Sequence, residues 1–340
     1  MSTYVANEPA AVALLPDRRR LALRLALVAG VLVALTVAIT SLPGLDEVRE
    51  RLSDASPGWL AAASVLQIAS CLAFVAAFRG VFCRRLPWRL SYEVGMAAQG
   101  TNVLLPSGGA GGLALAAWAL RQTGMPTDRL ARRTVAFYVL TSSVNFFTAV
   151  IAGVGLALAG GALLWTAGPA VAAALVIAGV LALPRLVSRP RPGPTGRVLT
   201  ALSAGIGDAV SLARAGNPLI VAAAIGFMAF DLLALGAAFS AIGALPPLGT
   251  LALAYVVGQL GGLVPLPGGV GGADGGLIAA LALYGTPLGA AAAAVLAYRA
   301  FQLGLPALLG ALAVLRLPRV LERAPDVGAL CEPRRVAMTA

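Results

Sequence analysis

Three ionisable side chains stand inside apolar runs of this chain, where a charge is expensive. Asp231 and Arg299 each lie near the middle of an apolar run, and Asp274 follows a glycine-rich break in another. A charge at the centre of a membrane-spanning helix costs at least ~2.5 kcal/mol, and such charges usually pair and mark substrate or ion paths. We therefore expect a buried pair between Arg299 and a carboxylate, and we take all three residues as candidate substrate-binding residues. The alternative is that the pair only locks the helices together.

The composition explains why these charges are unusual. The 340 residues are 59% hydrophobic and only 11% charged, whereas about a quarter of the residues in soluble domains are charged. Several apolar runs approach or exceed the ~20 residues that cross a bilayer as a helix. The sequence therefore predicts an all-α polytopic membrane protein.

The same composition narrows the chemistry. The net charge is +11 and the chain has no His, which removes the commonest general base and the commonest transition-metal ligand. The basic residues are all arginines that cluster between apolar runs, which indicates membrane topology and not nucleic-acid binding. The three cysteines have no metal-site spacing, and we expect no disulfide framework. We predict no enzymatic activity, no metal and no cofactor.

The apolar runs fall into two kinds. Two are interrupted: 91–120 by "LLPSGGAGG" at 104–112, and 251–284 by "PLPGGVGGADGG" at 265–276. An arm over 91–105 would reach only about 22 Å, too short to cross, so each interrupted run is predicted to be a re-entrant helical hairpin. The uninterrupted runs predict about six full transmembrane helices, at 21–41, 59–79, 134–158, 163–183, 218–242 and 288–314.

Arginine positions orient these elements. Arg-rich segments precede the first helix, flank the first hairpin and follow the last helix, which predicts cytoplasmic N- and C-termini in the cytoplasmic (plasma) membrane. The first hairpin then enters from the cytoplasm and the second from outside. Glu93 lies near the cytoplasmic edge and is expected to be solvated. We predict a disordered segment at 1–17, a transmembrane domain at 18–318 and a cytoplasmic tail at 319–340. A mildly amphipathic stretch within 184–215 is expected to lie on the membrane surface.

The two hairpins belong to an internal repeat. Gln99 matches Gln259 at an offset of 160, and with one residue inserted Gly124 and Pro126 match Gly285 and Pro287. The halves, about 20–158 and 163–314, have opposite predicted orientations. Inverted repeats with broken helices are typical of secondary transporters, which bind substrate near the membrane midplane; the alternative is chance similarity in an Ala/Gly/Leu-rich chain. At the offset of 160 the repeat also matches four glycines, Gly108, Gly109, Gly111 and Gly112, to Gly268, Gly269, Gly271 and Gly272.

The glycines suit a hairpin tip because glycine permits tight turns and close helix contacts. Each returning arm starts a helix near the midplane, where free backbone amides and the positive dipole end can hold an anion such as phosphate. Helix packing alone is an equally simple role. The candidate anion-binding residues are Asn102, Gly108, Gly109, Gly268, Gly269 and Gly271.

Residues 265–312 resemble the closing segment of the lysylphosphatidylglycerol synthase transmembrane region, the flippase-like family. The family pattern of Pro-Gly-Gly, a carboxylate, a Gly and a late Tyr-Arg is met here by Pro267, Gly268, Gly269, Asp274, Gly285, Tyr298 and Arg299. "NVLLPSGGAGG" at 102–112 resembles the earlier family motif, and the resemblance extends over residues 20–318. Two differences stand out: the family usually has Glu where Asp274 stands, and it commonly has Glu and Arg where this chain has Ala110–Gly112.

The resemblance implies lipid handling and adds Tyr298 to the candidate site. We predict a lipid flippase that moves a phospholipid or a polyprenyl- or glycolipid-type substrate, with an anionic-headgroup site between the two hairpins. The predicted partner is membrane lipid, together with a membrane-protein partner or a second copy of the chain. A non-transporting partner protein is the main alternative, and a lipid-carrier transferase is disfavoured because catalytic residues are missing. The sequence lacks the soluble aminoacyl-transfer domain of the full synthase, so we do not expect synthase activity from it alone.

Overall fold

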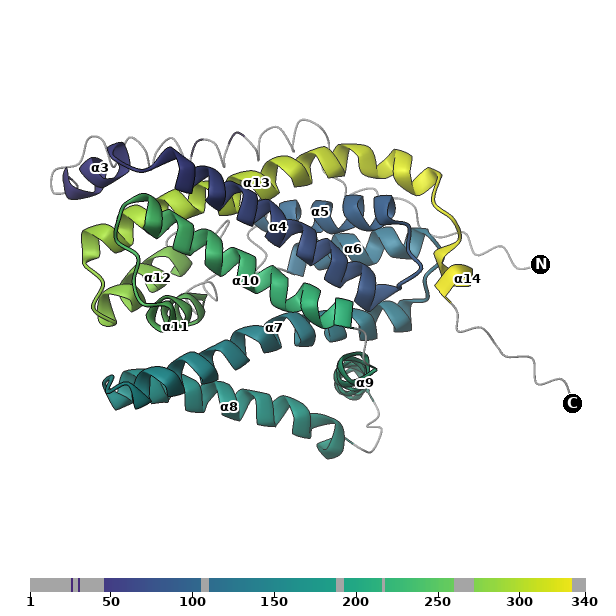
Figure 1. Cartoon of the computed structure of the whole chain (residues 1–340). Coiled ribbons are helices and arrows are strands. Elements are labelled where there is room, and N and C mark those ends of the chain that lie inside the picture. The colour runs from purple at the N-terminus through teal and green to yellow at the C-terminus, as the bar shows by residue number, and fades with distance from the viewer. Residues whose placement is uncertain are drawn as a thin grey trace, which may run out of the picture.

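The computed structural model describes residues 46–104, 110–187, 193–215, 218–259 and 272–331, together with residues 26 and 30. Every regular element in these ranges is a helix (Figure 1). The helices are α3 (Asp46–Ser53), α4 (Pro57–Phe82), α5 (Trp88–Leu104), α6 (Ala110–Gln122), α7 (Thr127–Leu158), α8 (Leu163–Leu186), α9 (Pro194–Arg214), α10 (Pro218–Ala241), α11 (Leu248–Gln259), α12 (Gly272–Leu283), α13 (Leu288–Glu322) and α14 (Val327–Cys331).

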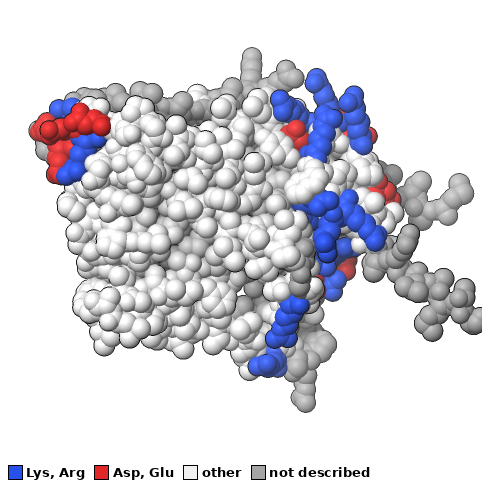
Figure 2. Space-filling view, viewed as in Figure 1, with Lys and Arg blue, Asp and Glu red and all other residues white. Residues whose placement is uncertain are grey.

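Five of these helices are long and apolar enough to cross a membrane: α4, α7, α8, α10 and α13. They confirm five of the six predicted spans, and the predicted span at 21–41 lies outside the described residues except for residues 26 and 30. Figure 2 shows a broad belt without charged side chains between two charged ends. Large apolar side chains such as Ile151, Leu158 and Leu175 are exposed, as expected of surfaces that face lipid. The chain is therefore an all-α polytopic membrane protein.

The interrupted runs form pairs of short helices. They contain 17 and 13 residues in α5 and α6, and 12 each in α11 and α12. At 1.5 Å per residue these helices are about 18–26 Å long, shorter than the ~30 Å hydrocarbon core. α5 packs against α6, and α11 packs against α12. The turns between the arms lie outside the described residues, and with them the predicted site glycines Gly108, Gly109, Gly268, Gly269 and Gly271.

The packing of the helices follows the internal repeat, with α4–α7 equivalent to α10–α13. α4 packs along its own equivalent, α10; α5 packs against α13, and the equivalent α11 packs against α7. The matched glycines Gly124 and Gly285 have φ values of +89° and +90°, so both end their helices in the left-handed conformation that glycine permits. The residue after each glycine makes the same backbone hydrogen bond: Met125 N–H donates to the Leu120 carbonyl, and Thr286 N–H donates to the Leu281 carbonyl. Figure 1 shows the hairpins toward opposite ends of the molecule.

One end of the molecule is rich in arginine (Figure 2). This arginine-rich end is formed by the connections α4–α5 and α6–α7, the adjoining ends of α5 and α6, and the end of α13. These segments carry Arg84, Arg85, Arg89, Arg121, Arg319 and Arg323. The opposite end carries α3 with its mixed charges. Near the arginine-rich end α9 lies across the long helices and is seen end-on in Figure 1. Arg133 of α7 and Asp208 of α9 form a 3.6 Å ion pair there. This orientation agrees with the expected amphipathic helix at the membrane surface.

The expectation of no disulfide was wrong for one pair. Cys83 and Cys331 are joined although 248 residues separate them in the chain, and their Cα atoms are 5.9 Å apart. The reason is that α14 folds back onto the arginine-rich end, where Val327 N–H donates to the Thr123 carbonyl at 2.7 Å. This return of the chain has no signature in the cysteine spacing.

The expectation for Glu93 was also wrong. Glu93 is 4% exposed, and its carboxylate lies 4.0 Å from the guanidinium of Arg316 on α13. The burial follows from the close approach of α5 and α13: a Cβ on Gly100 would stand 2.7 Å from the Cα of Gly310. With both positions glycine, the two backbones nearly touch and enclose the side chains beside the contact.

Candidate functional site

A polar cavity of about 390 Å³ lies where the two hairpins meet the long helices. Its lining residues fall near the middle of α4, α7, α10 and α13, within the uncharged belt. Both hairpins contribute: α5 supplies Gln99 and Asn102, and α11 supplies Tyr255 and Gln259. The polar lining residues are Gln67, Gln99, Asn102, Thr141, Asn145, Asp231, Tyr255, Gln259, Arg299 and Gln302. The cavity therefore offers a polar surface at the depth where lipid tails offer none.

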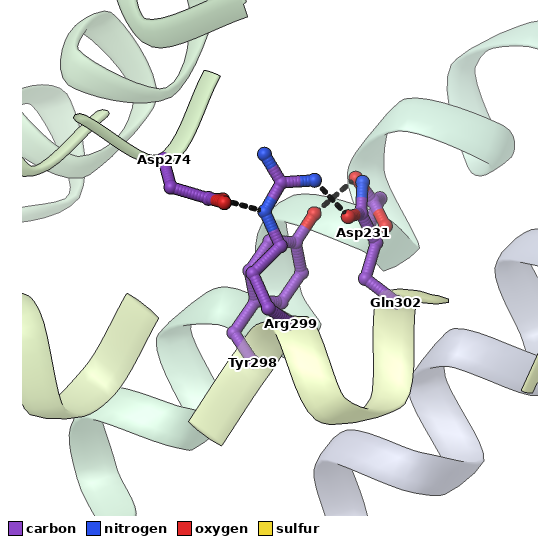
Figure 3. Close-up of polar contacts among 5 residues, drawn as sticks. All are labelled: Asp231, Asp274, Tyr298, Arg299 and Gln302. Atoms are coloured by element: carbon purple, nitrogen blue, oxygen red, sulfur yellow. Dashed lines mark hydrogen bonds and ion pairs between the residues drawn. The ribbon is translucent and has the colours of Figure 1, made fainter. Parts of the chain in front are cut away.

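Arg299 forms the expected buried ion pair, and its partner is Asp274. Its Nε donates to Asp274 Oδ1, and one terminal nitrogen donates to Gln302 Oε1 (Figure 3). The Arg299 and Asp274 side chains are 10% and 17% exposed. Asp274 stands in the first turn of α12, where the positive end of the helix dipole favours a carboxylate. The pair thus ties the second hairpin to α13 while Arg299 still lines the cavity.

Asp231 is held by two tyrosines. Its Oδ2 accepts hydrogen bonds from the hydroxyls of Tyr255 and Tyr298, the latter at 2.7 Å. Asp231 is 6% exposed and Tyr298 is 1% exposed. The carboxylate therefore lines the cavity while its hydrogen bond to Tyr298 is shielded from solvent. Figure 3 shows that Tyr298 and Arg299, neighbours on α13, bring the two carboxylates to opposite sides of one site. Sequence reasoning had named all four of these residues, and the structure brings them together.

Three amide side chains around the cavity each have a buried polar atom without a partner. Gln67 Oε1, Gln99 Nε2 and Asn145 Oδ1 are buried and have no hydrogen-bond partner among the described residues. A buried polar atom without a partner costs about 1–3 kcal/mol, so these atoms create a demand for water or a ligand. They come from α4, α5 and α7 of the first repeat, whereas the charged residues come from the second. The first repeat therefore contributes amides to the cavity, and the second repeat contributes its charged residues.

Residues 21–310 match the model of the lysylphosphatidylglycerol synthase TM region. The chain belongs to this family. The matched range includes both hairpins and every residue that lines the cavity, so the family resemblance carried by the Tyr298–Arg299 and glycine motifs is confirmed. A search of curated proteins found no match.

For this member of the lysylphosphatidylglycerol synthase TM region family, Asn102 has a clear structural contact. Its Oδ1 accepts a hydrogen bond from the backbone amide of Gly112 at 2.8 Å, which ties α5 to α6 while the residue still borders the cavity. A Cβ on Gly112 would stand 2.1 Å from the Ala98 carbonyl oxygen. Gly112 therefore serves close packing of the two arms, one of the two roles considered from the sequence.

Several cavity residues were missed at the sequence level. Gln67, Tyr255, Asn145 and Gln302 are single polar residues in apolar helices, and their convergence depends on how those helices are rotated and packed. One signal was available, because the repeat pairs Gln99 with Gln259 and both line the cavity. In the described part of the chain no three His, Cys, Asp or Glu residues gather as a metal site would require. The cavity's chemistry is one of hydrogen bonds and charge pairing.

Proposed function

We propose that this protein moves lipid headgroups across the membrane through the central cavity. As a multi-pass member of the lysylphosphatidylglycerol synthase TM region family, it belongs to a lipid-modifying and flippase-like group of membrane proteins. The observation that carries the proposal is the cavity of about 390 Å³ with partnerless buried amides at mid-membrane depth. A headgroup that crosses hydrocarbon must leave water, and such a site supplies replacement hydrogen bonds.

The charged residues of the cavity suit a headgroup that contains phosphate. Arg299 has donors on its guanidinium beyond those used for Asp274 and Gln302, and arginine binds phosphate oxygens well. Asp231 provides a carboxylate for an ammonium or hydroxyl group on the same headgroup. The substrate class that fits is a phospholipid, or a polyprenyl- or glycolipid-type lipid with a phosphate and polar substituents. No covalent step is required of any residue, so we propose a transporter and not an enzyme.

A neighbouring groove suits the lipid tails. A groove of about 290 Å³ lies between α7, α8 and α9, and it is lined mainly by apolar side chains such as Phe146, Val176 and Leu181. α7 separates the two spaces: Thr141 and Asn145 line the cavity, while Ser142 and Phe146 line the groove. The groove therefore offers lipid tails an apolar surface on the far side of the helix that lines the cavity. With the arginine-rich end in the cytoplasm, as the charge rule favours, a transported lipid would move between the two leaflets of the plasma membrane.

The test is flipping by purified protein in vesicles. Phosphatidylglycerol and phosphatidylethanolamine with a fluorescent label on one acyl chain would be included at trace level, and a membrane-impermeant quencher would report the labelled lipid in the outer leaflet. We expect the protein to flip lipid at least tenfold faster than protein-free vesicles. Asp231→Asn and Arg299→Gln should each reduce that rate at least tenfold.

The matched control changes an exposed Asp–Arg pair far from the cavity. Asp46 and Arg49 form a 3.0 Å ion pair on α3, and Asp46→Asn/Arg49→Gln should flip lipid at the wild-type rate. Wild-type protein that flips no faster than empty vesicles would refute transport and favour the role of a non-transporting partner. Active protein with unchanged rates in both cavity variants would refute the site.

A further inference from the structure

A second, smaller cavity lies at the arginine-rich end, apart from the central site. Its volume is about 140 Å³. One wall is the start of α5, the other is the last turn of α13, and the connection toward α14 closes it. The lining residues are Pro87, Arg89, Leu90, Arg319, Val320, Arg323, Ala324 and Pro325. The proposed lipid transport gives this arginine pocket no role.

Three arginines converge on the pocket. Arg319 and Arg323 are four residues apart along the chain at the end of α13, so they share one side of the helix end. Arg89 approaches from the first turn of α5, where the positive end of the helix dipole adds to its charge. Within the described ranges none of the three makes a side-chain hydrogen bond or salt bridge, and no carboxylate lines the pocket; an opposite charge nearby is that of buried Glu93, which Arg89 affects electrostatically. The pocket therefore concentrates positive charge without a counter-ion from its own lining.

Other arginines nearby are used differently. Arg85 and Arg129 donate to backbone carbonyls of α14, at 3.2 Å and 2.6 Å. Arg316 lies one turn before Arg319 and faces buried Glu93. These side chains hold the fold together, whereas those of the arginine pocket surround an open volume. The pocket arginines therefore differ from the other arginines of this end, which make contacts within the protein or only contribute to the charge that orients it in the membrane.

The pocket is also partly apolar. Leu90 and Val320 are buried beneath the arginines, and Pro87, Ala324 and Pro325 complete the lining. Its residues belong to the arginine-rich end, which borders the uncharged belt in Figure 2, and lipid headgroups are expected at such a boundary. Arginine binds phosphate through paired hydrogen bonds, and basic pockets between transmembrane helices bind anionic lipid headgroups. We propose that the arginine pocket binds the phosphate of an anionic phospholipid as a resident lipid, distinct from the lipid that is transported.

Binding of added lipid to delipidated full-length protein in detergent tests the proposal. Native mass spectrometry would count bound phosphatidylglycerol, with phosphatidylcholine and inorganic phosphate as comparison probes. We expect one tightly bound phosphatidylglycerol, and at least tenfold weaker binding of it in Arg89→Gln/Arg319→Gln/Arg323→Gln. The matched control, Arg84→Gln/Arg121→Gln/Arg132→Gln, removes three exposed arginines of the same region that do not line the pocket, and should bind within twofold of wild type.

A second variant that keeps all three arginines tests the pocket independently of any misfolding of the triple variant. Ala324→Phe would fill the pocket without removing an arginine, and it should weaken phosphatidylglycerol binding to a similar degree. Equal weakening in the pocket and control triples would overturn the proposal, because it would show diffuse attraction. Equal binding of phosphatidylcholine would also overturn it. Binding of inorganic phosphate without binding of phosphatidylglycerol would show a free-anion site and overturn the lipid assignment.

Discussion

The ion pair between Arg299 and Asp274 allows a quantitative test of the site. Arg299→Gln leaves two carboxylates, Asp274 and Asp231, without their nearest cation in the middle of the bundle. Breaking a buried pair by removing one partner typically costs about 3–5 kcal/mol. The two side chains are 10% and 17% exposed, and Arg299 borders the cavity, so the lower value, about 3 kcal/mol, is expected.

The reverse change should cost less. Asp274→Asn leaves Arg299 near a second carboxylate, Asp231, and bonded to Gln302, so we expect a loss of about 2 kcal/mol. The double variant Arg299→Gln/Asp274→Asn contains no unpaired charge from this pair and should also lose about 2 kcal/mol, not the sum of about 5. The expected coupling energy is thus about 3 kcal/mol, the upper end for residues in contact.

The measurement is the unfolding free energy in mixed detergent micelles, followed by circular dichroism as denaturing detergent is titrated. The exposed pair Asp46–Arg49 is the control, and its two single variants should each change the free energy by less than about 0.5 kcal/mol. If the losses of Arg299→Gln and Asp274→Asn simply add in the double variant, the two residues do not act as a buried pair and the reasoning fails.

Three further predictions follow from other contacts. Tyr298→Phe removes a donor from buried Asp231 and should lower the unfolding free energy by about 1–3 kcal/mol; an unchanged unfolding free energy would contradict the assigned hydrogen bond. Gly310→Ala, whose Cβ would stand 2.5 Å from the Cα of Gly100, should cost about 1–3 kcal/mol, whereas Gly304→Ala, with open space around it, should be neutral; reversed effects would refute the close α5–α13 contact. Denatured but unreduced protein should expose one free thiol and reduced protein three, as counted by alkylation and mass spectrometry, and three free thiols without reduction would show that α14 is not cross-linked.

The spans and hairpins were predictable because the membrane imposes simple length rules. Runs of about 20 apolar residues must be helices, so the boundaries of α8 and α10 agree closely with the sequence prediction. The short arms were recognisable because Pro and Gly interrupt them and arginines flank both sides of the first. The repeat was visible in a few matched residues, and Gly124 and Gly285 show why: each ends a helix with the same left-handed turn.

The composition of the cavity was only partly predictable. Asp231, Asp274 and Arg299 were conspicuous because charge is costly in the membrane, but the choice of Asp274 as the partner of Arg299 depends on where α12 begins. Gln67 and Asn145 carry no charge, and their convergence depends on helix rotation.

Contacts between distant parts of the chain were not predictable. The disulfide brings together residues that are 248 positions apart, and the burial of Glu93 depends on the approach of α5 to α13. Neither leaves a periodic or compositional signal. Such features follow from tertiary packing and become visible only when the helices are placed together.

The most direct test of the proposed transport is the flipping rate of protein whose cavity has been filled. Asn145→Phe places a ring in the cavity from α7, while Val154→Phe adds the same ring on an exposed position of the same helix. If headgroups cross through the cavity, Asn145→Phe reconstituted in vesicles should flip labelled phospholipid at least tenfold more slowly than wild type, and Val154→Phe should remain within twofold. A folded Asn145→Phe variant that flips lipid at the wild-type rate would contradict the account.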